Sequence, residues 1–200
     1  MKQLTALRGI VACVGLAFSV AAQQECRPPK EMRAAAENLT FAEGNPGSDP
    51  PGWLLGPDWF RPAGTLPAHE AKIVTGTSCS TNQQCAVVHS LRADHSGTCF
   101  LYQVIDAGQF RGKLLTYRAN VRVDVAAGSV ARLLVRVHRT DCSTSFRGDM
   151  GNHPVSAGIW APYEIQAPIA LDARDIEFGM QLIGEGAAWF DNVSIAFSDR

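Results

Sequence analysis

The pattern that most constrains the fold of this chain is a strict alternation of apolar and polar residues along successive segments. In residues 113–125 one face of the alternation carries Leu115, Tyr117, Ala119, Val121 and Val123, and the other carries Arg118, Asn120, Arg122 and Asp124. A period of two residues buries one face of a β-strand and leaves the other in solvent. The same period recurs in residues 130–139 and 175–183, which indicates half-buried antiparallel strands.

Eight segments have this character, with turn residues between them and no convincing internal helix. They are residues 71–75, 86–92, 99–106, 113–125, 130–139, 161–168, 175–183 and 188–197. Strands at this spacing predict an all-β jelly-roll β-sandwich of about eight to nine strands. We expect this β-sandwich domain to span residues 38–200, after a leader segment at 23–37 with a short helix at 30–37.

The first 22 residues have the features of a secretory signal peptide. Lys2 and Arg8 supply positive charge, residues 10–22 form an apolar run, and the run ends in the small residues Val-Ala-Ala. We expect cleavage near Ala22 and export to the periplasm or the extracellular space. The run is too short for a membrane span, and no later segment has about 18 uninterrupted apolar residues. Lipid attachment at Cys13 is the disfavoured alternative, because the apolar run continues past this residue.

The charge of the chain excludes two classes of partner. The formal net charge is −1, and neither acidic nor basic residues form blocks. There is therefore no electrostatic basis for binding nucleic acid or an anionic membrane. A mature chain of about 178 residues has the size of one domain with a real core, and we expect a monomer.

Five cysteines follow the signal segment, and in an exported protein disulfides are the default. Cys79 and Cys85 are the best local pair, because a short polar loop joins them between strand-like segments. Cys99 and Cys142 are candidates for a second bridge, although four cysteines allow three connectivities. Cys26 would then be left over. Zinc is disfavoured, since the chain has no Cys-x-x-Cys and no His-x-x-x-His pair.

Several motifs, in their order along the chain, carry a resemblance to a known family. They are Asn38-Leu39-x-Phe41-x-x-Gly44, Pro51-Gly52-Trp53, Phe110-Arg111-Gly112-Lys113, the segments 149–155 and 160–165, and the closing strand at 187–195. Together they resemble the galactose-binding-like jelly-roll domains of the carbohydrate-binding-module type found beside secreted bacterial hydrolases. The resemblance covers residues 38–195 and implies a β-sandwich that binds a glycan.

The resemblance also implies a structural calcium ion between the first and last strands. In the family an acidic residue follows the Phe directly, but here Ala42 takes that place and Glu43 comes next. Asp191 is retained in the last strand. Calcium takes about six to eight oxygen ligands, and two carboxylates are few. We therefore expect either no ion or a weak structural one, and no other cofactor.

Aromatic residues are the first candidates for ligand contact. Trp53, Trp59 and Trp160 could stack on a sugar ring, because a flat aromatic face covers the apolar C–H patch of a pyranose. Phe60 belongs to the same set, whereas Trp189 fits packing within the sandwich better. The alternative for each is a role in the core or in anchoring a loop.

Polar residues on the alternating strands form a second candidate set. Their side chains are donors and acceptors suited to hydroxyls or carboxylates. The set comprises Arg118, Asn120, Arg122, Arg136, His138 and Gln181 on strands, with Asp149, Asn152 and His153 in a glycine-containing loop. The alternatives are a merely solvated sheet face and a turn held by Asp and Asn side chains.

Catalytic motifs are weak in this sequence. There is no Gly-x-Ser-x-Gly segment, and His69-Glu70 lacks the second histidine of a zinc-protease helix. We therefore expect an exported, non-catalytic binding module with a glycan as its ligand. The first alternative is an accessory domain that binds a partner protein beside a secreted hydrolase, and a weaker one is a hydrolase with an unrecognised site.

Overall fold

A computed structural model describes residues 31–56, 68–81, 83–91, 97–151, 153–156 and 158–200 of the chain. Within these residues the chain forms eleven β-strands and two short 3-10 turns, Gly76–Ser78 and Gly108–Phe110. The strands are β1 (Met32–Arg33), β2 (Leu54–Gly56), β3 (His69–Thr75), β4 (Gln84–Ser90), β5 (Thr98–Asp106), β6 (Leu114–Val125), β7 (Val130–Arg139), β8 (Thr144–Gly148), β9 (Ala161–Pro168), β10 (Ala173–Ile183) and β11 (Gly186–Ser198).

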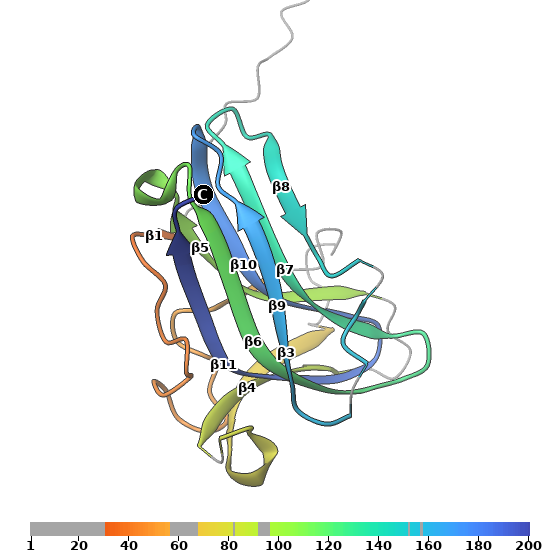
Figure 1. The fold of residues 1–200 in the computed structure, drawn as a ribbon. Coiled ribbons are helices and arrows are strands. Elements are labelled where there is room, and N and C mark those ends of the chain that lie inside the picture. Colours follow the sequence, from red (N-terminus) through yellow and green to blue (C-terminus); the bar gives the residue numbers. More distant parts are fainter. Residues whose placement is uncertain (1–30, 57–67, 82, 92–96, 152, 157) are drawn as a thin grey trace, which may run out of the picture.

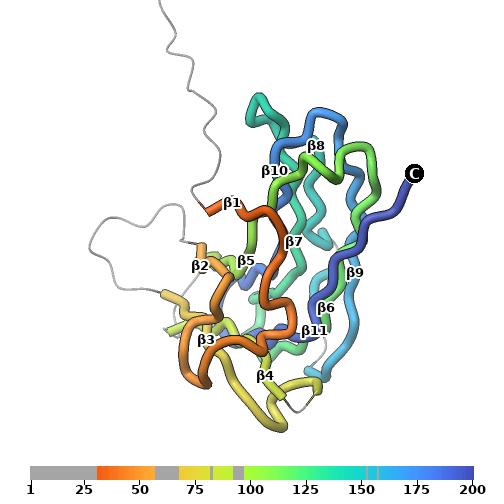
Figure 2. The backbone as a smooth tube through the Cα atoms, turned by 90° about the vertical axis from the view of Figure 1, so that its left-hand side faces the viewer, coloured from red at the N-terminus to blue at the C-terminus, as the bar shows by residue number. Residues whose placement is uncertain are grey.

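The strands form two sheets packed face to face. The six-stranded sheet has the order β1-β5-β10-β7-β8, with β2 also paired to β5, and the five-stranded sheet has the order β3-β4-β11-β6-β9. Figure 1 shows β6, β9 and β11 in front of β10 and β7, and Figure 2 shows the two layers from the side. Most neighbouring strands are distant in the sequence and antiparallel, as in a jelly roll.

The all-β jelly-roll sandwich is confirmed, and all eight expected strands are present. Three short strands were missed, namely β1, β2 and β8. The expected helix at 30–37 is wrong for the part that the structure describes, because Met32 and Arg33 pair in parallel with Val104 and Ile105 of β5. The six-stranded sheet thus extends into the segment that we expected to be a leader.

The core lies between the sheets and is built from the inward face of each strand. On β6, Tyr117 and Val121 are fully buried, as the alternation predicts. The Tyr117 hydroxyl donates a hydrogen bond of 3.0 Å to the carbonyl oxygen of Gly179, which links the five-stranded sheet to the six-stranded sheet. Burial of the phenol raises the pKa of Tyr117 well above its usual value.

Trp53 belongs to this core. It is 8% exposed, and its ring centroid lies 5.2 Å from that of Phe41 and 5.3 Å from that of Phe190. Its indole N–H donates a hydrogen bond to the carbonyl oxygen of Asn38 at 3.1 Å. The expectation that Trp53 stacks on a ligand is therefore wrong, because its side chain is buried inside the sandwich.

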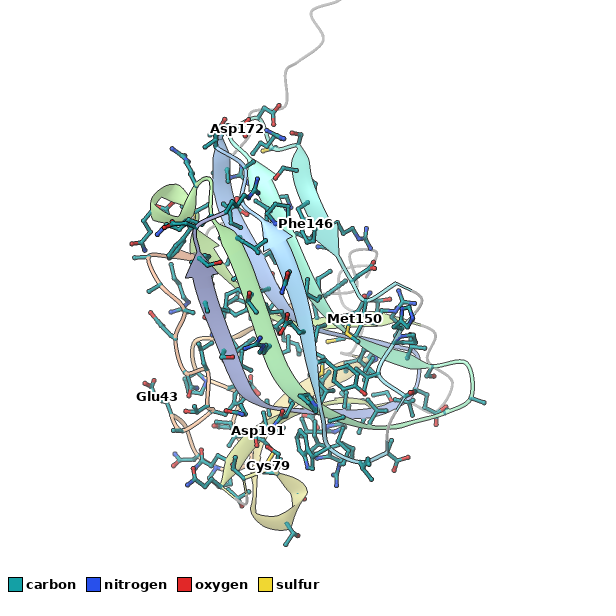
Figure 3. All side chains as sticks on the ribbon, viewed as in Figure 1. Glu43, Cys79, Phe146, Met150, Asp172 and Asp191 are labelled. Atoms are coloured by element: carbon teal, nitrogen blue, oxygen red, sulfur yellow. A yellow bond between two sulfur atoms is a disulfide. The ribbon has the colours of Figure 1, made fainter. Side chains whose placement is uncertain are left out.

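β8 is a short strand on the edge of the six-stranded sheet. Phe146 from β8 packs against the core, and Met150 follows the strand (Figure 3). The backbone N–H of Leu133 on β7 lies 3.2 Å from the Met150 sulfur. These contacts hold the 144–150 segment against β7.

The expected disulfide between Cys79 and Cys85 is present, with an S–S distance of 2.15 Å. It closes a short loop between β3 and β4. The second expected bridge, from Cys99 to Cys142, is not formed: Cys99 is buried on β5 and its thiol faces the carbonyl oxygen of Gly56 at 3.9 Å, whereas Cys142 is disulfide-bonded. Cys26 lies outside the described residues.

No helix in the described part of the chain is long and apolar enough to cross a membrane. The expected signal peptide lies outside the described residues.

Candidate functional site

The outer face of the six-stranded sheet carries partly buried charged side chains from two neighbouring strands, β7 and β10. Pairing between β5, β10 and β7 sets its rows: Glu177 lies between Val104 and Arg136, and Gly179 lies between Tyr102 and Leu134. We call this surface the six-strand face, defined by Phe100, Tyr102, Val104, Arg132, Leu134, Arg136, His138, Asp175, Glu177, Gly179 and Gln181.

An ion pair occupies the middle of the six-strand face. The Nη1 atom of Arg136 donates to Oε1 of Glu177 at 2.9 Å, and the two side chains are 17% and 13% exposed. The guanidinium carbon of Arg136 also lies 5.2 Å from the ring centroid of Phe100. Both partners are thus held in place while each keeps a small accessible surface and unused hydrogen-bonding capacity.

A second charged cluster lies one row along the same strands. His138 Nδ1 is 2.7 Å from Oδ1 of Asp175, and Nε of Arg174 donates to Oδ2 of Asp175 at 2.5 Å. Burial opposes ionisation of Asp175, but these hydrogen bonds outweigh it and lower the pKa of its carboxyl. A fixed carboxylate on Nδ1 orients the imidazole and leaves Nε2 for another partner.

The pKa of the Glu177 carboxyl is shifted in the opposite direction to that of Asp175. Burial raises the pKa of Glu177, and the positive charge of Arg136 offsets only part of this effect. Burial also raises the pKa of the neighbouring Tyr102, and the charge of Glu177 adds to that effect. The pKa of Asp175 is therefore lowered and that of Glu177, two residues along the same strand, is raised. Perturbed pKa values of this kind are frequent at ligand-binding and catalytic sites.

The shift at Glu177 has a measurable consequence for stability. A carboxyl whose pKa is higher in the folded state binds more protons there, so stability falls as pH rises between the unfolded and folded pKa values. We expect the free energy of unfolding of wild type, minus that of Glu177→Gln, to fall as pH rises above the ordinary glutamate pKa of 4.5. Urea unfolding of both proteins across a pH series measures this difference. A difference that rises with pH over that range would show that Glu177 is stabilised as an anion.

The structure brings three of the expected site residues together. Arg136, His138 and Gln181 share the six-strand face, with Gln181 opposite Arg132 in the β10–β7 ladder. The Nε of Arg132 is buried and has no acceptor in the part of the chain that the structure describes. Buried donors are normally hydrogen-bonded, so this end of the face lacks an acceptor.

The other expected residues are dispersed. Arg118 lies on the outer face of the five-stranded sheet, where its Nε is 2.5 Å from Oε2 of Glu164, and Trp160 immediately precedes β9 of the same sheet. Asp149 follows β8 and accepts a hydrogen bond from the backbone N–H of Gly151 at 3.1 Å, as in a turn. Trp59, Phe60 and Asn152 lie outside the described residues.

Four residues of the six-strand face were not predicted from the sequence as candidate site residues: Phe100, Tyr102, Asp175 and Glu177. The alternation in 175–183 did place Glu177, Gly179 and Gln181 on one face, but nothing local marked β5 as their neighbour. β5 is apolar on both faces, which hides its period, and its polar Gln103 points inward, where it bonds the backbone of Glu37.

The two expected calcium ligands have different surroundings. Asp191 is buried, and its Oδ2 accepts hydrogen bonds from the Ser80 backbone N–H at 3.1 Å and the Ser80 hydroxyl at 2.6 Å. Figure 3 shows Asp191 close to Cys79, and Glu43 on a loop at the left edge of the molecule. In that loop the Asn38 amide donates to the carbonyl oxygens of Glu43 and Pro51 and accepts from the Glu43 N–H.

The described side chains include no cluster of three or more His, Cys, Asp or Glu residues that could hold a metal. Our expectation of no calcium, or of a weakly bound structural ion, stays a prediction.

Comparison with known proteins gives no family at the level of sequence. No family model matches the chain, and no curated protein matches it. Solved structures do match. A cyclase from Fischerella sp. TAU is similar with a TM-score of 0.62 at 15% identity, covering 82% of this chain and 96% of the cyclase.

Carbohydrate-binding modules are similar as well. The CBM22-1 xylan-binding domain of Paenibacillus barcinonensis Xyn10C has a TM-score of 0.52 at 12% identity, covering 81% of this chain and 93% of that domain. TmCBM61, solved in complex with β-1,4-galactotriose, has a TM-score of 0.52 at 12% identity, covering 83% of this chain and 99% of the module.

These likenesses correct one expectation and confirm another. We expected a protein without catalytic activity, because catalytic motifs are weak in its sequence. That expectation is contradicted by the similarity to the Fischerella cyclase, since the fold is shared by an enzyme. The structure and its neighbours do establish the architecture: this chain is a two-sheet jelly-roll β-sandwich, and its fold is similar to that of carbohydrate-binding modules.

Proposed function

We propose that this protein binds a hydroxyl-rich ligand, a short oligosaccharide, on the six-strand face. The Arg136–Glu177 pair, one row from the partly exposed ring of Tyr102, is the observation that carries the proposal. A guanidinium donates to sugar hydroxyls, a carboxyl accepts from them, and an aromatic ring covers the C–H patch of a pyranose. The xylan-binding and galactotriose-binding neighbours lend support from proteins of the same fold.

The face is suited to this task because its polar groups are ordered before any ligand arrives. Arg136 is fixed by Glu177 and Phe100, and His138 is fixed by Asp175. Binding then orders few additional side chains, which reduces the entropic cost of association. The buried Nε of Arg132 supplies a donor that a ligand hydroxyl would satisfy.

Calorimetry with β-1,4-galactotriose and xylohexaose, before and after substitution of Arg136, tests the proposal. Hydrogen bonds to a charged group contribute about 1.5–3 kcal/mol, so Arg136→Ala is expected to weaken binding about tenfold or more. Arg118→Ala is the matched control, because Arg118 is also ion-paired to a glutamate but lies on the other sheet. Tyr102→Ala provides a second variant that leaves the ion pair intact.

Equal losses in the Arg118 and Arg136 variants would contradict the placement of the site, as would full affinity in both Arg136→Ala and Tyr102→Ala. The accessory-domain alternative would be favoured by two results together: the wild-type protein binds a partner protein that Arg136→Ala does not bind, and the wild-type protein binds no member of a broader oligosaccharide panel.

A second candidate is proton-transfer catalysis on a ligand bound at the same face. Because burial raises the pKa of Glu177, its carboxyl is a candidate proton donor, and the imidazole held by Asp175 is a candidate proton acceptor at Nε2. The likeness to a cyclase gives this candidate weight. NMR of the ligand tests this candidate. Wild type should convert the ligand to a product, whereas Glu177→Gln should bind the ligand without converting it. Conversion at equal rates by both proteins would show that Glu177 takes no part in the chemistry.

We further infer that the protein is exported. The N-terminal pattern and the Cys79–Cys85 disulfide support this, since disulfides persist in oxidising compartments.

A further inference from the structure

A second surface of interest lies on the opposite side of the sandwich, on the outer face of the five-stranded sheet. There the guanidinium carbon of Arg122 lies 4.1 Å from the ring centroid of Trp189 and 5.8 Å from that of Trp160. Arg122 is paired directly with Trp189 in the β6–β11 ladder, and Trp160 precedes Ala161, which pairs with Val121. All three side chains are partly exposed. We call this arrangement the Trp160–Arg122–Trp189 stack.

Arg122 differs from most arginines of the described sheets because it forms no ion pair with a carboxylate of the described residues. The ion-paired arginines of the described chain are Arg33, Arg118, Arg136, Arg139, Arg147 and Arg174. The two aromatic faces stabilise the charge of Arg122, because their quadrupoles attract a cation. The positive charge is therefore available to an anion.

Two donors in the stack also lack acceptors. The Nε of Arg122 and the indole Nε1 of Trp160 are buried, and neither has a hydrogen-bond partner among the residues that the structure describes. Unsatisfied buried donors are rare and normally mark a missing water, ion or ligand. Trp160 follows the exposed residues Gly158 and Ile159 and lies outside the ladder of β9. Because both donors are buried, binding of one acceptor to both requires the indole of Trp160 to turn.

A carboxylate meets these requirements. It accepts two parallel hydrogen bonds from a guanidinium and neutralises its charge. The indole faces on either side suit the C–H patch of a sugar ring. We propose that the Trp160–Arg122–Trp189 stack binds a uronic acid residue of an acidic oligosaccharide, at a site separate from the six-strand face.

Asp124 limits what this site accepts. It is the next outward-facing residue along β6, it is exposed, and it pairs with Ala187 beside Trp189. Its negative charge disfavours an anion nearby, so the site is matched to one carboxylate rather than to a densely charged polymer.

The proposal is tested by titrating tri-galacturonic acid, followed by calorimetry and by NMR of the indole N–H resonances. We expect the Trp160 indole resonance to shift and Arg122→Gln to weaken binding about tenfold or more, as expected for loss of charge-assisted hydrogen bonds. Arg118→Gln, four residues along β6 and already paired with Glu164, is the matched control and should change the affinity little. Asp124→Asn should strengthen binding by removing a like charge.

Two comparisons separate this site from the one proposed above and from a peptide site. Arg136→Gln on the six-strand face should leave the shift that tri-galacturonic acid causes in the Trp160 indole resonance unchanged, and the neutral β-1,4-galactotriose should not shift that resonance. Unchanged affinity in Arg122→Gln, equal binding of the neutral trisaccharide at the stack, or binding of an acidic peptide in place of the uronate would overturn the proposal. If Arg122→Gln strongly lowers the melting temperature, Arg122→Lys replaces it in the test, because lysine keeps the positive charge but lacks the planar guanidinium. Full affinity of Arg122→Lys for tri-galacturonic acid would contradict recognition of the carboxylate by the guanidinium.

Discussion

Replacing Trp53 by Ala is expected to destabilise the protein by about 3–5 kcal/mol, as for other large-to-small substitutions of buried aromatic residues. The substitution removes a ring that contacts Phe41, Phe178 and Phe190 and an indole hydrogen bond to the carbonyl oxygen of Asn38. A domain of ordinary stability has about 5–15 kcal/mol in total, so the variant should be close to unfolding at moderate temperature. Chemical denaturation monitored by circular dichroism gives the value directly.

Two variants make this result interpretable. Trp53→Phe keeps most of the apolar volume and should lose much less stability, while Trp160→Ala removes a partly exposed ring and should lose less still. A Trp53→Ala protein with wild-type stability would mean that Trp53 is exposed, as the sequence first led us to expect for a ligand-stacking residue.

Gly179→Ala is expected to destabilise the protein by about 3 kcal/mol or more, at the upper end of the range for overpacking. A Cβ atom at this position would lie 2.1 Å from the carbonyl oxygen of Leu101 and 2.7 Å from the Cα atom of Tyr102. Both are backbone atoms of β5, so β5 and β10 would have to separate at the centre of the six-strand face. Thermal and urea unfolding of the variant check the loss of stability.

Gly158→Ala is the control for this substitution. Its Cβ atom would approach nothing closer than the Val123 carbonyl oxygen at 3.9 Å, so its stability should match that of wild type. If Gly179→Ala is as stable as Gly158→Ala, then β5 and β10 do not approach each other as closely as the structure shows.

The long strands were predictable because their alternation is local. Tyr117, Val121 and their neighbours on β6 are buried as the period of two requires. β8 was missed because five residues with one partner strand carry too short a pattern. β1 was missed for the same reason, since its two residues owe their strand conformation to pairing with β5.

The candidate site was only partly predictable because it depends on pairing between distant segments. The alternation placed Arg136 and His138 on one face of β7, and Glu177 and Gln181 on one face of β10, but it did not show that these two faces are adjacent. Tyr102 joins them through the β5–β10 ladder, across a large separation in sequence. Trp53 was misassigned because its loop position is local, whereas its burial depends on Phe178 and Phe190 near the other end of the chain.

The central claim is that the six-strand face binds an oligosaccharide, and NMR titration with neutral β-1,4-galactotriose and xylohexaose tests it most directly. Backbone amide shifts should cluster on β5, β7 and β10 around Tyr102, Arg136 and Glu177, and should disappear in the Arg136→Ala variant while persisting in Arg118→Ala. Shifts confined to the five-stranded sheet, or a complete absence of shifts with a broad panel of neutral oligosaccharides at millimolar concentration, would contradict the claim.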